Sequence, residues 1–166
     1  MRLEPLFNQR QRIDELALLL HNEWGNLPPW SSLTVIVERL FGANPGVPFP
    51  WTIVALSDQD QLLGTASLKL WELSDHPDKE HWLGEVFVRR EWRGRGVGTA
   101  LIRESIDYVR AAGVTDLYLY TPDQQSLYRR FGWVAIEQAQ VNGESVAVMK
   151  LATTPDLSSH RGTLDE

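Results

Sequence analysis

The stretch VFVRREWRGRGVGTALI, residues 86–102, places a glycine-rich turn between an apolar strand pattern and a helix pattern. At such a turn the first N–H groups of the helix lack intrahelical partners and carry the positive end of the helix dipole. Glycines at 94, 96 and 98 remove Cβ atoms, so the backbone amides can approach phosphate oxygens closely. Four arginines add positive charge around the same turn: Arg89, Arg90, Arg93 and Arg95. The stretch therefore predicts a site for a ligand that carries a pyrophosphate.

Length and composition narrow the possible functions. The 166 residues, of which 43% are hydrophobic and 23% charged, are enough for one compact domain with a sizeable core. The net charge of -6 argues against a protein that coats nucleic acid, because such binding needs many Lys and Arg contacts to phosphate. The absence of cysteine excludes disulfides, thiolate metal sites and a cysteine nucleophile. The opening MRLEPLFNQRQR has no signal-peptide core and LALLL is too short to span a membrane, so we expect a cytoplasmic protein without membrane or nucleic-acid partners.

Hydrophobic periodicity and turn residues predict the order strand, two helices, three strands, helix, strand, helix, two strands. The last helix follows the strand TDLYLY, with Thr121 as its cap, and Asn142-Gly143 joins the last two strands as a hairpin turn. Hairpins make antiparallel pairs and a strand-helix-strand unit makes a parallel one. We therefore predict an α+β (α/β layered) domain with a mixed sheet over residues 1–151. The polar residues 152–166 predict a mobile tail.

Three phosphate-binding motifs compete for the glycine turn (residues 93–98). A P-loop requires G-x-x-x-x-G-K-[ST], and no glycine of the turn is followed by lysine. A Rossmann fingerprint requires G-x-G-x-x-G and an acidic residue near the end of the next strand, but the third glycine comes one residue early and Asp116 begins its strand. The pattern R/Q-x-x-G-x-G/A is satisfied by Arg93, Gly96 and Gly98. The spacing therefore favours the third motif.

This motif, between an apolar strand and a helix, resembles the coenzyme A signature of the GNAT superfamily of N-acetyltransferases. A second block, LYTPDQQSLYRRFGW, resembles the family's tyrosine followed by a short spacer and Gly-Phe, here Tyr128, Gly132 and Trp133. The resemblance covers roughly residues 3–151. It implies a GNAT-like, mostly antiparallel sheet of seven strands with about four helices, splayed between its fourth and fifth strands.

The resemblance also implies acetyl-CoA as the acetyl donor. In the family the pantetheine arm pairs with the fourth strand, which places it along Val86, Phe87 and Val88, and the pyrophosphate rests on the amides that follow. The cofactor-binding residues of that part are then Arg93, Gly94, Arg95, Gly96, Val97, Gly98 and Thr99. Thr121 stands where many members carry asparagine, so the cofactor contact expected there departs from the family pattern. No metal is expected, because this chemistry needs none.

For catalysis, the resemblance implies direct attack of an amine on the thioester, without a covalent enzyme intermediate. Tyr128 occupies the position of the family's general acid, which protonates the departing thiolate; the alternative is a packed aromatic residue. Glu85 is the best candidate for the base, because it is a carboxylate within an apolar strand, where burial would raise its pKa. Strict alternation places the Glu85 side chain on the other face of the sheet from Val86 and Val88, and a β-bulge would change that alternation. The alternatives are an ion-paired Glu85 and a base at His81, His21 or Glu23.

The family's acceptor site lies near the first two helices, here the segment HNEWGNLPPW. Trp24 and Trp30 form a candidate aromatic wall and Glu23 a partner for a cationic amine, although tryptophans at this spacing are more often core packing. An acidic run from Glu72 to Glu80 also fits a basic acceptor. A short similarity to N-terminal acetyltransferases that modify actin adds peptide α-amines to polyamines, aminoglycosides and amino-acid-like metabolites. An acyl-CoA sensor and a nucleotide-binding oxidoreductase are the other functions considered, and we expect a monomer or homodimer.

Overall fold

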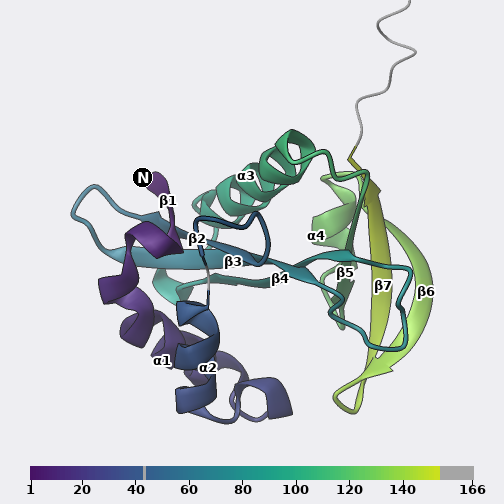
Figure 1. The fold of residues 1–166 in the computed structure, drawn as a ribbon, viewed down its shortest axis with the longest axis horizontal. Helices are drawn as coiled ribbons and strands as arrows, with labels where there is room; N and C mark the ends of the chain where they lie inside the picture. Colours follow the sequence, from purple (N-terminus) through teal and green to yellow (C-terminus); the bar gives the residue numbers. More distant parts are fainter. Residues whose placement is uncertain (43, 154–166) are drawn as a thin grey trace, which may run out of the picture.

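The computed structural model describes residues 1–42 and 44–153, and in them seven strands form one sheet (Figure 1). The strand order is β1-β2-β3-β4-β5-β7-β6, and every neighbouring pair is antiparallel except the pair of β4 and β5. The predicted mixed, mostly antiparallel sheet is therefore confirmed. The strands are β1 (Arg2–Pro5), β2 (Trp51–Leu56), β3 (Leu62–Leu70), β4 (His81–Val88), β5 (Asp116–Thr121), β6 (Val134–Val141) and β7 (Glu144–Ala152).

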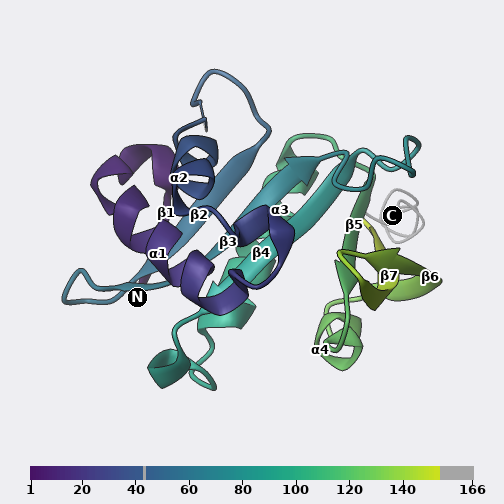
Figure 2. The same cartoon turned by 90° about the horizontal axis from the view of Figure 1, so that it is seen from below.

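Four α-helices of the described residues accompany the sheet. They are α1 (Ile13–Trp24), α2 (Leu33–Phe41), α3 (Val97–Ala111) and α4 (Gln125–Arg129). Figures 1 and 2 show α1 and α2 on one face of the sheet and α3 on the other. In this part of the chain, no helix is long and apolar enough to cross a membrane.

Hydroxyl groups determine where two of these helices begin. Ser32 caps α2, because its hydroxyl accepts the Val35 N–H at 3.4 Å. The Thr121 hydroxyl accepts the N–H of Gln124 at 2.9 Å, so it closes a turn ahead of α4 and does not cap the helix as predicted. The first residue of α4 is therefore Gln125, and the helix is only five residues long.

Apolar side chains pack on both faces of the sheet. Leu101 of α3 belongs to the cluster on one face, and Leu20 of α1 and Ile36 of α2 belong to the cluster on the other. Consecutive residues of a strand point to opposite faces, so Ile53 joins the α3 cluster and Val54 the α1–α2 cluster. Both faces of β2 are covered, and all of its residues are buried.

β4 and β5 separate after a single ladder pair. Trp82 and Tyr118 form that pair, whereas β5 pairs with β7 from Asp116 through Thr121. Figure 2 shows β4 and β5 diverging, with β5, β6 and β7 forming a separate group of strands. The predicted splay between the fourth and fifth strands is confirmed, and it makes the space for the functional site.

The C-terminal end of the fold lies later than predicted. β7 continues through Ala152, and Thr153 is fully buried, with its N–H donating to the Thr115 carbonyl at 2.9 Å. Both residues therefore belong to the fold and not to the predicted tail. The remainder of that tail, residues 154–166, lies outside the described residues.

A histidine joins the loop between β3 and β4 to the edge strand β6. The Asp75 and Glu137 carboxylates lie 2.8 Å from Nδ1 and 2.6 Å from Nε2 of His76. The hydrogen bond to Asp75 is the main cause that raises the pKa of His76, burial opposes it, and Glu137 adds to the increase. The imidazolium form of His76 therefore stabilises the contact between this loop and the sheet edge.

Replacing His76 with glutamine is expected to lower the melting temperature at pH 5.5 by about 2 °C and to change it little at pH 9. A raised folded pKa means that this stability is fully present below the unfolded value of 6.5 and is lost as the pH rises through the folded value. Thermal unfolding across this range measures the effect, and Glu137→Gln should remove only part of it, because the hydrogen bond to Asp75 is the larger cause of the raised pKa. Equal destabilisation at both pH values would contradict the role given to the charged form.

Candidate active site

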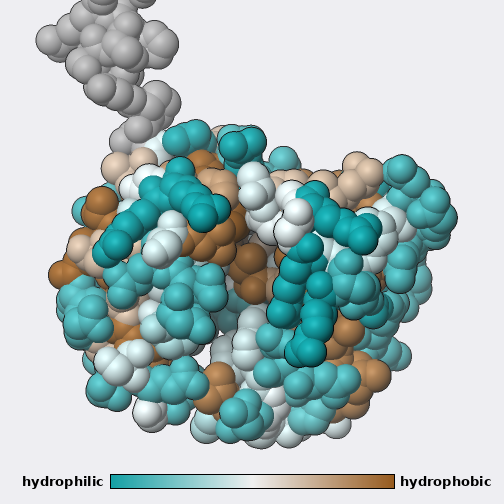
Figure 3. Space-filling model, turned by 180° about the vertical axis from the view of Figure 1, so that it is seen from behind, coloured by the Kyte–Doolittle hydropathy of each residue, from teal (hydrophilic) through white to brown (hydrophobic). Residues whose placement is uncertain are grey.

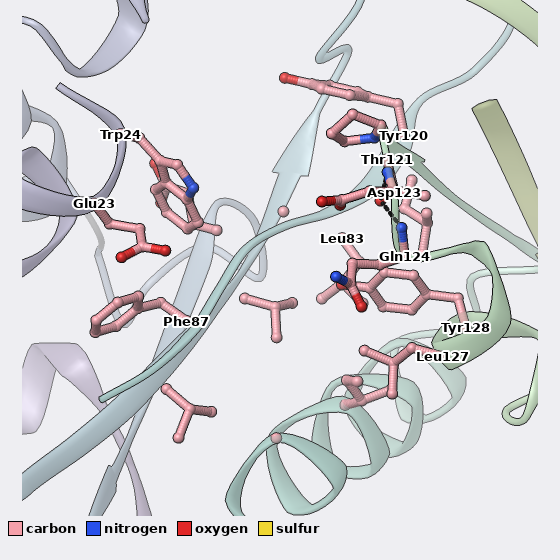
Figure 4. Close-up of a pocket in the computed structure, with 18 of the residues that line it drawn as sticks. Glu23, Trp24, Leu83, Phe87, Tyr120, Thr121, Asp123, Gln124, Leu127 and Tyr128 are labelled. Atoms are coloured by element: carbon pink, nitrogen blue, oxygen red, sulfur yellow. Dashed lines mark hydrogen bonds between the residues drawn. The ribbon is translucent and has the colours of Figure 1, made fainter. Parts of the chain in front are cut away.

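A cavity of about 690 Å³ opens where β4 and β5 separate. Its walls come from the end of α1, from β4, from the glycine turn, from β5 and from α4. Figure 4 shows Glu23 and Trp24 on one side and Tyr120 and Tyr128 on the other. Seen from behind in Figure 3, the surface is hollowed near its middle, with apolar side chains inside the hollow and hydrophilic ones around it. The cavity brings together residues that were predicted separately for the acetyl donor and for the acceptor.

The glycine turn has open space beside the first backbone amides of α3. Gly94 and Gly96 have φ angles of 77° and 84°, in the left-handed region that glycine adopts readily, and Gly96 is the N-cap of α3. A Cβ atom at either position would meet no atom within 4 Å, so the turn has open space beside it. Gly98 and Thr99 also line the cavity. Backbone amides at the N-terminus of a long helix suit a bound anion.

Other residues predicted for this turn have different surroundings. Arg93 lines the cavity, and its Nη2 atom lies 3.5 Å from the Glu23 carboxylate on the opposite side. Arg95 lies over the Trp92 ring, with 4.9 Å between the guanidinium carbon and the ring centre. Val97 is buried in the α3 cluster. The side chains of Arg95 and Val97 are therefore engaged away from the cavity, and a contact from either residue would come from its backbone.

β4 offers an open edge to the cavity. Val86, Phe87 and Val88 line it, and on their other side this part of β4 pairs with β3. Among the described residues, the ladder between β4 and β5 does not reach these positions. Such an edge can pair with an extended chain as an added strand does. Thr121 lines the cavity as well, but its hydroxyl already accepts backbone N–H groups before α4.

Tyr128 is the buried residue of α4. Its side chain lines the cavity, and its ring meets Trp133 edge-on at 5.7 Å. Leu127 and Phe131, which lie near Tyr128 in the chain, are only partly buried. Burial raises the pKa of Tyr128 to about 12, so its hydroxyl keeps its proton at physiological pH. The hydroxyl is therefore available as a proton donor.

Glu85 lies in a β-bulge. Between the pairs Thr65–Phe87 and Ser67–Gly84, β4 has two residues where β3 has one, and Glu85 has a φ of 52°. Its side chain is only 1% exposed, although Glu85 contributes to the cavity wall. The expectation that its pKa is raised is wrong. Burial acts in that direction, but the positive charges of Lys69 and Arg39 outweigh it and lower the pKa.

Aromatic rings form the wall near α1. The ring centres of Trp24 and Trp30 lie 5.3 Å apart, and Trp24 meets Phe87 edge-on at 6.1 Å. Glu23 lines the same end of the cavity, so the three residues predicted for the acceptor lie together. Trp30 is almost completely buried, which also makes it part of the α1–α2 cluster. Trp30 therefore packs in the core and also forms part of the aromatic wall of the cavity, so both interpretations apply to it.

The sequence profile of the acetyltransferase (GNAT) family matches residues 13–133. The chain belongs to this family. As a GNAT protein it is an N-acetyltransferase, and its acetyl donor is acetyl-CoA. The resemblance predicted from the glycine turn and the tyrosine block is therefore confirmed. No curated protein sequence is similar enough to this one to count as a relative.

Solved structures share the fold of this GNAT protein at low sequence identity. An aminoglycoside 6'-N-acetyltransferase complexed with coenzyme A is 17% identical with a TM-score of 0.74, covering 94% of this chain and 99% of that one. A spermidine N-acetyltransferase variant from Vibrio cholerae is 19% identical with a TM-score of 0.69, covering 92% and 95%. A ribosomal-protein-alanine N-acetyltransferase from Brucella melitensis is 18% identical with a TM-score of 0.72, covering 92% and 99%. Identities this low show the fold alone.

The cavity of this acetyltransferase also contains polar residues that the sequence did not single out: Lys69, Tyr120, Asp123, Gln124 and Glu144. The alternation of TDLYLY, with Tyr118 and Tyr120 two residues apart, could have indicated Tyr120, but no local signal marks Lys69. His21 and His81, considered as bases, do not line the cavity, and His21 Nδ1 instead lies 2.7 Å from the Trp30 carbonyl oxygen. Within the described residues, no group of three histidine or acidic side chains is placed to hold a metal ion.

Proposed function

We propose that this GNAT protein acetylates a primary amine of a cationic small molecule, of the polyamine or aminoglycoside class. The observation that carries this proposal is the charge of the cavity wall. Five acidic residues line it, Glu23, Glu72, Glu85, Asp123 and Glu144, against two basic ones, Lys69 and Arg93. A cavity lined mainly by one sign of charge concentrates ligands of the opposite sign.

The surroundings of Tyr120 support the same conclusion. Burial is the main cause that raises its pKa to about 12, and the negative charges of Glu72, Glu85 and Glu144 add to the increase. These carboxylates therefore lie near enough to act on one hydroxyl inside the cavity. Trp24 and Trp30 at the α1 end add aromatic faces, which attract ammonium groups. Two of the similar structures are of enzymes named for aminoglycoside and spermidine substrates.

The site holds the reactants without forming a covalent intermediate. The amides of the glycine turn hold the pyrophosphate of acetyl-CoA, and the open edge of β4 holds the pantetheine arm. When the neutral amine attacks, the new C–N bond forms, the C–S bond of the thioester breaks and the nitrogen releases one proton to solvent water. Tyr128 donates its hydroxyl proton to the departing thiolate and is later reprotonated by solvent. The products are the N-acetylated amine and free coenzyme A.

A panel of acceptors tests the proposal through release of the coenzyme A thiol. We expect kcat/KM for spermidine or an aminoglycoside to exceed that for glutamate and for a neutral peptide by at least about tenfold, because the cavity wall is negative. Raising the ionic strength should reduce that preference. Preference for a peptide α-amine or an anionic amine would contradict the cationic class. Thiol release that no amine increases would favour the acyl-CoA sensor instead.

A further inference from the structure

Glu85 is the most completely buried charged side chain of the cavity wall, and its backbone conformation is costly. A non-glycine residue at a φ of 52° is strained by about 1–3 kcal/mol, and such strain persists only where surrounding contacts fix the residue. Around Glu85 those contacts come from three different parts of the chain. The β-bulge therefore places the Glu85 carboxylate at a buried position where these contacts meet.

Four donors surround that carboxylate. Oε1 accepts the Trp30 indole N–H at 3.2 Å, lies 3.2 Å from Nζ of Lys69 and is paired with the Arg39 guanidinium. Oε2 accepts the Ser67 hydroxyl at 3.1 Å. An ionised carboxylate has about two acceptor positions on each oxygen, so Oε1 is fully engaged, and Oε2 is held by Ser67. The residues that hold Glu85 belong to the turn before α2, to α2 itself and to β3.

Three of these partners connect Glu85 to the acceptor end of the cavity. Trp30 and Lys69 line the cavity, and Nζ of Lys69 lies 5.8 Å from the centre of a Trp30 ring. Lys69 also lies 3.4 Å from Glu72, another residue of the wall. Arg39 does not line the cavity; it reaches Glu85 from α2 and so ties that helix to the sheet. Glu85 is the shared partner of all three.

We propose that Glu85 is a positioning residue: it holds Trp30, Lys69 and, through Arg39, helix α2 in the arrangement that binds the acceptor, and it does not take the acceptor's proton. The proposal rests on the proposed function, because the acceptor is a cationic amine of the same cavity. The Glu85 side chain is 1% exposed, and its negative charge is already balanced by Lys69 and Arg39, so the carboxylate is engaged by the protein's own donors and not by an incoming ammonium. The lowered pKa agrees with this, since such a group is a weak base.

Steady-state kinetics of Glu85→Gln distinguish a positioning residue from a general base. In Glu85→Gln we expect the acceptor KM to rise at least about tenfold, because Arg39 and Lys69 lose the charge that holds them, while the KM for acetyl-CoA stays within about twofold. The acidic limb of the kcat/KM profile should stay at the same pH, because it reports the acceptor's own ammonium. If Glu85 were the general base, the substitution would remove the acidic limb of the kcat/KM profile, and that result would overturn the proposal.

Arg39→Met distinguishes positioning from a general charge effect. Removing a positive charge outside the cavity makes the wall more negative, so a pure charge effect would lower the KM of a cationic acceptor. Positioning requires the opposite, a KM that rises about as far as in Glu85→Gln, and a lower KM would overturn the proposal. Ser67→Ala is the matched control, because it removes one neutral donor from Glu85 and should change the acceptor KM by less than about threefold.

Carbon NMR of the Glu85 carboxyl group, assigned by its loss in Glu85→Gln, gives a readout that needs no activity. We expect the group to remain ionised down to a pH below the ordinary glutamate range. A titration at pH 6 or above would overturn the proposal, even if every assayed amine failed as a substrate. Failure of the acceptor panel with an ionised Glu85 would instead count against the proposed function alone.

Discussion

Gly96→Glu is expected to abolish acetyl-CoA binding and, with it, acetyl transfer. Gly96 is the N-cap of α3 and lines the cavity, so a carboxylate there would stand where the pyrophosphate is held. Two unit charges about 4 Å apart repel by about 4 kcal/mol at an effective dielectric constant of about 20. That energy corresponds to roughly a thousandfold weaker binding. Isothermal titration calorimetry with acetyl-CoA measures the loss directly.

Two further variants separate charge from backbone strain. Gly96→Ala introduces a Cβ at a φ of 84°, which costs about 1–2 kcal/mol of stability, and its affinity should fall by less than about tenfold. Gly113→Glu adds the same charge at a comparable φ of 79°, but at the other end of α3 and outside the cavity wall. It should lower the melting temperature and keep acetyl-CoA binding within about threefold. Equal loss of binding in both glutamate variants would contradict a specific anion site at Gly96.

The glycine turn was predictable because its signal is local. The spacing of Arg93, Gly96 and Gly98 between a strand pattern and a helix pattern lies within a few residues, and short-range backbone geometry decides it. The order of strands and helices follows for the same reason, since hydrophobic periodicity and turns are local too. What the turn's arginines contact was not predictable: Arg89, for example, donates to the Leu62 carbonyl and pairs with Glu15 of α1.

The acceptor end of the cavity depends on contacts between distant segments. The sequence identifies Glu85 as a carboxylate in an apolar strand, but it cannot show that Arg39 and Lys69 meet it across three elements. The sign of the pKa shift depends on those two cations, so burial alone led to the wrong direction. The start of α4 was misplaced for a related reason, because the Thr121 hydroxyl can cap a helix or close a turn before it.

Tyr128→Phe is expected to leave acetyl-CoA binding within about twofold and to lower kcat by about a hundredfold, the usual size of a lost general acid. The ring keeps its packing on Trp133, so the variant removes only the hydroxyl. Because burial raises the pKa of Tyr128 to about 12, the hydroxyl is protonated at every pH of a practical assay. The loss of kcat should therefore be the same factor from about pH 6 to pH 9. Thiol release at saturating acceptor, measured across that range, tests the prediction.

Tyr118→Phe provides the matched control for this substitution. Tyr118 is also a buried tyrosine next to the splay, on β5, but its ring packs with Trp82 and it does not line the cavity. We expect its kcat to stay within about twofold of the unmodified protein. Normal turnover of Tyr128→Phe across the whole pH range would remove Tyr128 from the role of proton donor. A deficit confined to high pH would show that another group supplies the proton at lower pH, since a hydroxyl of this pKa does not lose its proton within that range.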